Sequence, residues 1–179
     1  MTISKLLGNF AIIACLAAPM SLAAQSLPSG EFSLTTQFRK AEGECLEGNQ
    51  INGALEGAAF MDRCQNVSGQ VWRALPEGDG YYRLTTEFRA PHNECLEGNQ
   101  LNGAMNGAAF MDRCQNVSGQ LWRVIPAEGG YFRLTTQFRE PFNECLEGNQ
   151  LGGDYGGAAF MATCQNVTGQ LWTILPAPN

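Results

Sequence analysis

From residue 31 onward, the chain consists of one segment of about 50 residues that occurs three times in succession. Two landmarks recur in every copy: the string Glu-Cys-Leu-Glu-Gly-Asn-Gln begins at Glu44, Glu94 and Glu144, and tryptophans follow at Trp72, Trp122 and Trp172. Near-identical copies at a constant interval are typical of repeat architectures. We predict three units, at 31–80, 81–130 and 131–179, within a single domain over 31–179.

Each unit is predicted to contain about four short strands, which in the second unit cover 82–88, 94–98, 108–114 and 120–125. Tyr82, Leu84 and Thr86 fall on one face of the first strand, as alternation in a sheet requires. Clusters of Gly, Pro, Asn and Asp separate the strands, and no stretch has a sustained helical period. A short β unit cannot bury its apolar face alone, and no unit looks like a solenoid cap. We therefore predict an all-β fold that closes with pseudo-threefold symmetry.

Six of the seven cysteines fall into three pairs, one in each unit, with 18 residues between the two members of a pair. The repeat selects one bridge per unit, and the predicted disulfides are Cys45–Cys64, Cys95–Cys114 and Cys145–Cys164. The alternative is metal binding by free pairs. His92 is the one histidine of the chain, and no short Cys-x-x-Cys spacing occurs, so metal binding by the cysteines is not expected. No cofactor is expected either.

The first residues have the pattern of an export signal. Lys5 precedes a short apolar run, and small residues stand at Ser21, Ala23 and Ala24, so 1–24 is predicted to be a signal peptide. A secreted or periplasmic location follows, where disulfides form readily. The alternative is a lipoprotein anchored at Cys15.

The formal net charge of −6 argues against two classes of partner. An acidic protein is repelled by phosphate backbones, so nucleic acid is not expected. Nothing basic and amphipathic suggests a membrane surface.

One cysteine-leucine-acid strand, one apolar strand that ends in cysteine, and a Gln-x-Trp motif follow each other in every unit. The Gln-x-Trp motifs are Gln70-Val71-Trp72, Gln120-Leu121-Trp122 and Gln170-Leu171-Trp172. This order resembles the ricin B-type lectin repeat over all of 31–179. The resemblance implies a β-trefoil with the tryptophans in its core, and a module that binds carbohydrate or a glycoconjugate.

The chain departs from that family at two positions of each unit. The acid two residues after the first cysteine is Glu47, Glu97 or Glu147, where the family has Asp. The residue two before the second cysteine is Asp62, Asp112 or Ala162, where the family usually has an aromatic residue that stacks on the sugar.

A candidate site follows if the bridged cysteines stand directly opposite each other in an antiparallel pair. Glu47 then faces Asp62, Glu97 faces Asp112, and Leu46 and Met61 point inward while the carboxylates point outward. Two like charges in this position need a neutralising group. The candidate carbohydrate-binding residues are Glu47, Asn49, Asp62, Arg63, Glu97, Asn99, Asp112, Arg113 and Glu147.

Three interpretations of these residues stay open. The acid and its neighbouring arginine form a surface salt bridge, or they bind a polar ligand, or the carboxylates Glu47/Asp62 and Glu97/Asp112 bind calcium. Ala162-Thr163 replaces both members of the acid-arginine pair in the third unit, so the first two units are expected to be the competent ones. The recurring Arg39, Arg89 and Arg139 are expected to pair with nearby acids.

Three function classes are to be distinguished. A lectin with several weak sites is the leading hypothesis. An enzyme is not expected, because no Ser-His-Asp or Cys-His set can be assembled from one histidine and paired cysteines. The alternative is a protein-interaction module, such as a toxin accessory subunit, an adhesin or an inhibitor.

Overall fold

The structure is a computed structural model that describes residues 26–48, 57–98, 107–148 and 157–177. The predicted signal at 1–24, with Cys15, lies outside the described residues, and so do Asn49 and Asn99. Among the described residues, no helix has the length and the apolar character needed to cross a membrane.

Six strands close into an antiparallel barrel in the order β1-β12-β9-β8-β5-β4. The barrel strands are β1 (Phe32–Thr36), β4 (Trp72–Gly78), β5 (Tyr81–Thr86), β8 (Trp122–Pro126), β9 (Phe132–Thr136) and β12 (Trp172–Pro176). The other six strands form three separate hairpins. These hairpins are β2 (Glu44–Glu47) with β3 (Phe60–Arg63), β6 (Glu94–Glu97) with β7 (Phe110–Arg113), and β10 (Glu144–Glu147) with β11 (Phe160–Thr163).

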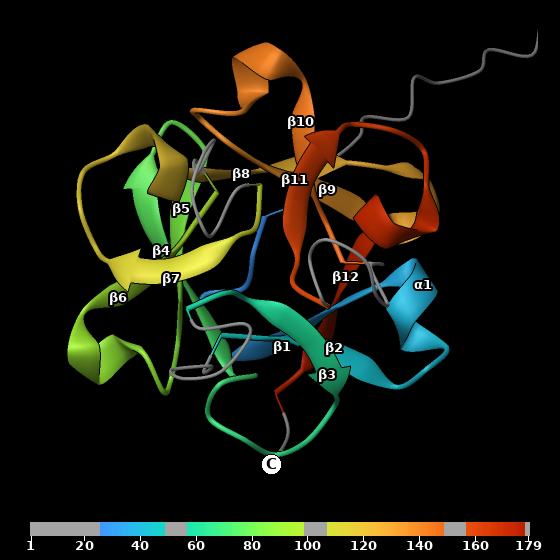
Figure 1. Cartoon of the computed structure of the whole chain (residues 1–179), viewed down its shortest axis with the longest axis horizontal. Helices are drawn as coiled ribbons and strands as arrows, with labels where there is room; N and C mark the ends of the chain where they lie inside the picture. Colours follow the sequence, from blue (N-terminus) through green and yellow to red (C-terminus); the bar gives the residue numbers. More distant parts are fainter. Residues whose placement is uncertain (1–25, 49–56, 99–106, 149–156, 178–179) are drawn as a thin grey trace, which may run out of the picture.

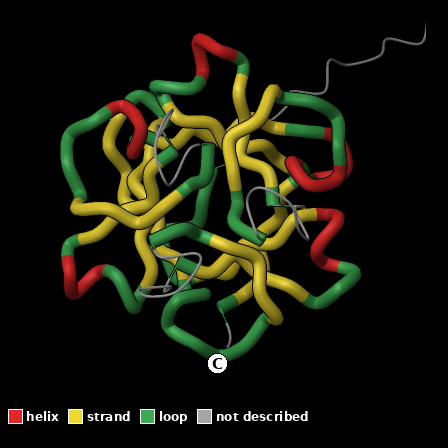
Figure 2. The backbone as a smooth tube through the Cα atoms, in the orientation of Figure 1, coloured by secondary structure: helices red, strands yellow, loops and turns green. Residues whose placement is uncertain are grey.

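The hairpins are arranged around the centre of the view with threefold symmetry, each beside its own part of the barrel (Figure 1 and Figure 2). A barrel of six strands with three hairpins is a β-trefoil, which confirms the predicted fold class. The four strands of the second unit are all present, and the described residues form twelve strands in total.

Short helical turns complete each unit. They are α1 (Gln37–Lys40), η1 (Ala90–His92), η2 (Ser118–Gln120), η3 (Glu128–Gly130), η4 (Glu140–Phe142) and η5 (Thr168–Gln170). The sequence did not predict them, and they shorten the strand expected at 82–88. Thr86 ends this strand because its side-chain oxygen accepts a hydrogen bond from the backbone N–H of Arg89 at 3.1 Å.

The threefold axis is closed by backbone hydrogen bonds between the units. Ala59 donates to the carbonyl of Ala109, Ala109 to that of Ala159, and Ala159 to that of Ala59, at 2.8, 2.8 and 2.7 Å. The strand expected at 108–114 begins only at Phe110, because the alanines before it pair around the axis instead of within the hairpin. All three alanines are fully buried.

The core lies between the barrel and the hairpins. Trp72, Trp122 and Trp172 are completely buried, which confirms their predicted place. Each indole N–H donates to the carbonyl of the hairpin leucine of its own unit at 2.8 Å, so the tryptophan ties the last strand of the unit to the hairpin. Burial of aromatic rings with their polar group satisfied is a strong stabilising arrangement.

Three buried arginines link consecutive units. Arg89 donates from Nε to the carbonyl of Gly48 at 2.8 Å, and its Nη1 lies 2.5 Å from Oε2 of Glu94. The same two contacts join Arg139 to Gly98 and Glu144, and Arg39 to Gly148 and Glu44. The expectation that these arginines pair with nearby acids is confirmed.

The three predicted disulfides are all formed, with Cα atoms 4.9 Å apart in each. Three disulfides in one small domain indicate an oxidising compartment, such as the periplasm or the extracellular space.

Candidate functional site

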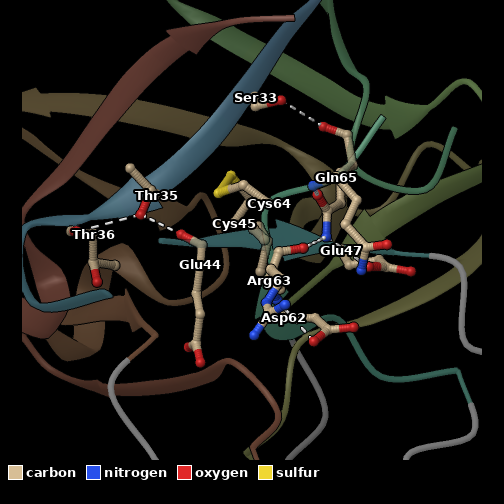
Figure 3. Close-up of a disulfide and its surroundings, with 12 residues drawn as sticks. Ser33, Thr35, Thr36, Glu44, Cys45, Glu47, Asp62, Arg63, Cys64 and Gln65 are labelled. Atoms are coloured by element: carbon tan, nitrogen blue, oxygen red, sulfur yellow. Dashed lines mark hydrogen bonds between the residues drawn. A yellow bond between two sulfur atoms is a disulfide. The ribbon is translucent and has the colours of Figure 1, made fainter. Parts of the chain in front are cut away.

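The register of the hairpins differs from the predicted one by two residues. Cys45 stands opposite Asp62, and Glu47 stands opposite Phe60. The prediction that Glu47 faces Asp62 is therefore wrong, as is the same prediction for Glu97 and Asp112. Cys64 lies just beyond β3, where its backbone N–H donates to the carbonyl of Gly43, so the bridge runs diagonally across the hairpin. Figure 3 shows this bridge and its surroundings.

The faces of the hairpin are assigned correctly in spite of the register. Leu46 and Met61 point into the core and are 0% and 7% exposed, as predicted. Cys45, Glu47, Phe60 and Asp62 share the other face, because side chains alternate along a strand.

Glu47 is buried instead of pointing into solvent, with an exposed fraction of 5%. Its Oε2 accepts a hydrogen bond from Nε2 of Gln70 at 2.8 Å, and the same amide group donates to the carbonyl of Arg63. The amide oxygen of Gln70 accepts from the backbone N–H of Gln65. The glutamine of the Gln-x-Trp motif thus fixes the carboxylate of Glu47 against the end of β3.

The second and third units repeat this arrangement. Gln120 donates to Glu97 at 2.7 Å, and Gln170 donates to Glu147 at 2.8 Å. Glu97 is 6% exposed, whereas Glu147 is only partly buried.

Asp62 and Arg63 are exposed at the open end of the hairpin. Oδ1 of Asp62 accepts a hydrogen bond from the backbone N–H of Arg63 at 2.7 Å, and Asp112 and Arg113 repeat this contact. The guanidinium groups of Arg63 and Arg113 form no ion pair with any described residue, so the interpretation as a surface salt bridge is wrong.

Phe60 was missed by the sequence analysis. It is partly exposed, and it stands opposite Glu47 on the same face as Asp62. Directly opposite residues have Cβ atoms about 5 Å apart, and the diagonal pair of Glu47 and Asp62 is about 7 Å apart. Phe110 and Phe160 take the same position in the other units. The sequence offered one signal for this residue, which is a phenylalanine at the same position of all three units. The assumed register placed Asp62 opposite Glu47, so it did not bring Phe60 next to this carboxylate.

The third unit keeps the aromatic ring and the buried glutamine but lacks the second acid. Ala162 and Thr163 stand where the other units have an acid and an arginine. Its face offers Phe160 and the more exposed Glu147.

No group of three or more His, Cys, Asp or Glu residues within the described part of the chain is placed to bind a metal ion. The calcium interpretation depended on two carboxylates directly opposite each other, and the observed register removes that premise.

Comparison with models of known protein families and with curated protein sequences finds no match. Solved structures do match. The designed threefold-symmetric protein ThreeFoil superposes with a TM-score of 0.65 at 18% identity, over 82% of this chain and 98% of its own. SeviL bound to an asialo-GM1 saccharide gives 0.58 at 16% identity, over 84% of this chain and 100% of its own.

A third match is a cytolethal distending toxin from Actinobacillus actinomycetemcomitans, with a TM-score of 0.61 at 17% identity, over 83% of this chain and 92% of the toxin chain. At these identities the similarity establishes the β-trefoil fold and not the function.

Proposed function

We propose that the protein is a non-catalytic carbohydrate-binding module that holds a sugar against the outer face of its hairpins. The observation that supports this proposal is Phe60, a partly exposed ring on the same face as the carboxylates of Glu47 and Asp62. A sugar ring has an apolar face of C–H groups and a rim of hydroxyls. A flat aromatic surface beside carboxylate acceptors complements both features.

The residues of each site have different tasks in this proposal. Phe60 is the apolar platform, and Asp62 and Arg63 are the exposed acceptor and donor for sugar hydroxyls. Glu47 is mostly a support, because burial and the hydrogen bond from Gln70 leave little of its carboxylate accessible. Asn49 and Asn99 remain candidates that lie outside the described residues.

The second unit offers the same set, in Phe110, Asp112, Arg113 and Glu97. The third unit has Phe160 and Glu147 without an exposed acid at position 162, so we expect it to bind more weakly. Sites of this kind are weak one by one, and three on one body gain avidity on a surface that presents many glycans. SeviL has the same fold and is bound to a saccharide, which agrees with the proposal.

A glycan array probed with the full chain tests the proposal, followed by calorimetry on a retained glycan. The double variants Phe60→Ala/Phe110→Ala and Asp62→Ala/Asp112→Ala should each weaken binding at least about 10-fold, which is 1.4 kcal/mol. The second variant gives the first two units the alanine that the third already has.

Phe142→Ala is the matched control, because this ring is 61% exposed and lies outside the hairpins. The proposal would be contradicted if the full chain bound no glycan on the array. It would also be contradicted if all of these variants bound the glycan with equal affinity. Recovery of a bound oligosaccharide unchanged after long incubation tests the non-catalytic part.

A protein-interaction module is the second candidate, and one surface feature favours it. Phe142 packs against Phe138 with ring centroids 6.0 Å apart, and His92 and Glu42 stand at the corresponding positions of the other units. Exposed aromatic surface is typical of contact sites between proteins. Binding to a purified partner that survives removal of its glycans and is lost in Phe142→Ala would favour this candidate.

A further inference from the structure

The first unit contains a cavity of about 190 Å³ that lies beside its disulfide. The cavity opens between β1, β12 and the turn that follows β3, and Figure 3 shows Ser33, the disulfide and Gln65 in this region. Its walls are mainly apolar. The lining residues are Ser33, Cys45, Cys64, Gln65, Asn66, Leu175 and Pro176.

Ser33 occupies a position where the threefold repeat is broken. The corresponding residues are Arg83 in the second unit and Arg133 in the third. All three stand at the same place in the barrel, because Ser33 pairs with Leu175, Arg83 with Leu75, and Arg133 with Ile125. The serine is short and buried, and its hydroxyl donates to the carbonyl of Gln70 at 3.0 Å.

In the third unit the arginine reaches the two residues that correspond to Gln65 and Asn66. Arg133 donates from Nε to the carbonyl of Gln165 and from Nη2 to Oδ1 of Asn166, both at 3.0 Å. A different hollow, of about 470 Å³, lies beside Arg133 and the turn at 127–129, and neither cysteine of the third disulfide borders it. Gln65 and Asn66, the counterparts of the two acceptor residues, line the cavity of the first unit.

In the second unit the arginine is directed elsewhere. Nη1 of Arg83 pairs with Oε1 of Glu77 at 2.8 Å. The third unit therefore shows that a guanidinium group can bind to the residues that correspond to Gln65 and Asn66.

From this comparison we infer that the cavity of the first unit is a binding site for a short alkylguanidinium, a ligand equivalent to the side chain of Arg133. The alkyl tail lies against the disulfide, Leu175 and Pro176, and the planar head donates to the carbonyl of Gln65 and to Asn66 at the rim. The head is placed beside Gln65 and Asn66 because these polar residues are exposed, and the mainly apolar remainder of the lining is left for the tail.

Size and charge agree with this ligand. A cavity of about 150 Å³ accepts benzene, and propylguanidinium is similar in size. The chain carries a net charge of −6, which attracts cations toward its surface. Neither Phe60 nor Asp62 lines the cavity, so the inference does not depend on carbohydrate binding.

The test is a titration of the full chain with propylguanidinium. Binding is monitored through the backbone amide NMR signals of Ser33, Asn66 and Leu175. We expect saturable shifts of these signals with a dissociation constant on the order of 1 mM, as suits so small a ligand. Ser33→Arg should weaken binding at least 10-fold because the new side chain fills the cavity from within. Ser33→Ala keeps the space and should keep binding, which separates filling of the cavity from loss of the hydroxyl.

The more stringent test is whether the third unit gains a binding site. Arg133→Ser should create a second site, seen as new shifts at Gln165 and Asn166, and Ser33→Arg/Arg133→Ser should move the single site from the first unit to the third. Failure of Arg133→Ser to bind while the first unit binds would overturn the argument from symmetry. Ser33→Arg and Arg133→Ser each introduce the residue that another unit has at the same position, so we expect these variants to fold.

Two further ligands define the chemistry. Propylurea is neutral and nearly the same shape, and equal binding of it would overturn the requirement for a cation. Arginine capped at both ends carries a backbone where the free tail would enter, so it distinguishes a small ligand from the arginine side chain of a protein. Binding of the capped arginine as tight as that of propylguanidinium would overturn the inward orientation of the tail.

Discussion

The Nε of Arg89 donates a hydrogen bond to the carbonyl of Gly48, which belongs to the preceding unit, at 2.8 Å. The side chain of Arg89 is 7% exposed, and its guanidinium also pairs with Glu94. Arg89→Met keeps the aliphatic stem and removes both contacts, leaving a carbonyl and a carboxylate without their donor. We expect a loss of about 3 kcal/mol in the free energy of unfolding, measured by chemical denaturation.

The matched control for Arg89 is Arg73, which pairs with Glu31 on the surface of the barrel. Its side chain is 43% exposed and that of Glu31 is 45% exposed. Exposed pairs contribute little, so Arg73→Met should cost less than about 1 kcal/mol. Equal losses in the two variants would show that burial of the arginine between units adds nothing.

Gly98 lies where two units meet, and we expect Gly98→Ala to lower the free energy of unfolding by about 2 kcal/mol. A Cβ at this position would stand 3.0 Å from Sδ of Met161, 3.0 Å from the ring of Trp122 and 3.2 Å from Cγ2 of Thr136. Gly30→Ala serves as control, because a Cβ there meets nothing within 4 Å. Denaturation midpoints of the two variants that do not differ would contradict the close packing.

The disulfide Cys95–Cys114 closes a loop with a sequence separation of 19 residues. Removal of such a bridge frees the unfolded chain, so Cys95→Ala/Cys114→Ala should lower stability by about 3 kcal/mol. The equivalent double variants of the first and third units should behave alike, since the three bridges close loops of the same length. A cost below about 1 kcal/mol in denaturant titrations would argue against this effect.

Burial and a hydrogen bond to Glu140 raise the pKa of Tyr81 above its ordinary value of 10.0. Between pH 10 and the pKa in the folded state, the unfolded chain loses the phenol proton while the folded chain keeps it. The stability that Tyr81 contributes is thus present below pH 10 and is lost as the pH rises through the folded pKa.

The test compares the wild-type chain with Tyr81→Phe. Alkaline titration of tyrosinate absorbance should show one late-titrating group that is absent from the variant. Denaturation at about pH 9 and about pH 11 should show a smaller loss of stability in Tyr81→Phe than in the wild type. The raised pKa would be contradicted if the titration curves of the wild type and of Tyr81→Phe had the same shape and differed only in amplitude, by the contribution of one tyrosine.

The repeat was sufficient to predict the class of fold, the three disulfides and the inward direction of Leu46 and Met61. These depend on features that the sequence states directly: periodicity, the pairing of cysteines within units, and alternation along strands. A slip of one residue in a strand would exchange its two faces and would conflict with the hydrophobic pattern.

The register of the hairpin, by contrast, cannot be predicted from the hydrophobic pattern. A slip of two residues preserves every inside and outside position, so the pattern of Leu46 and Met61 fits either register equally well. The prediction assumes directly opposed cysteines, whereas Cys64 lies one residue beyond β3 and bridges diagonally to Cys45. The assumed register therefore gives Asp62 the wrong partner and does not bring Phe60 next to Glu47.

The cavity beside Ser33 was also beyond reach of the sequence. The exchange of arginine for serine is visible in an alignment of the three units. Its consequence depends on what surrounds position 33 in space, which comes from β12 and the turn after β3, far apart in the chain.

The cyclic hydrogen bonds of Ala59, Ala109 and Ala159 have a consequence for how such a chain could arise. Each alanine gives one hydrogen bond to the next unit and receives one from the previous unit, so neither one copy nor two can complete the circuit. A lone 50-residue ancestor would have needed two sister molecules to satisfy these groups. The present chain carries all three partners on one polypeptide, and its assembly is therefore independent of concentration.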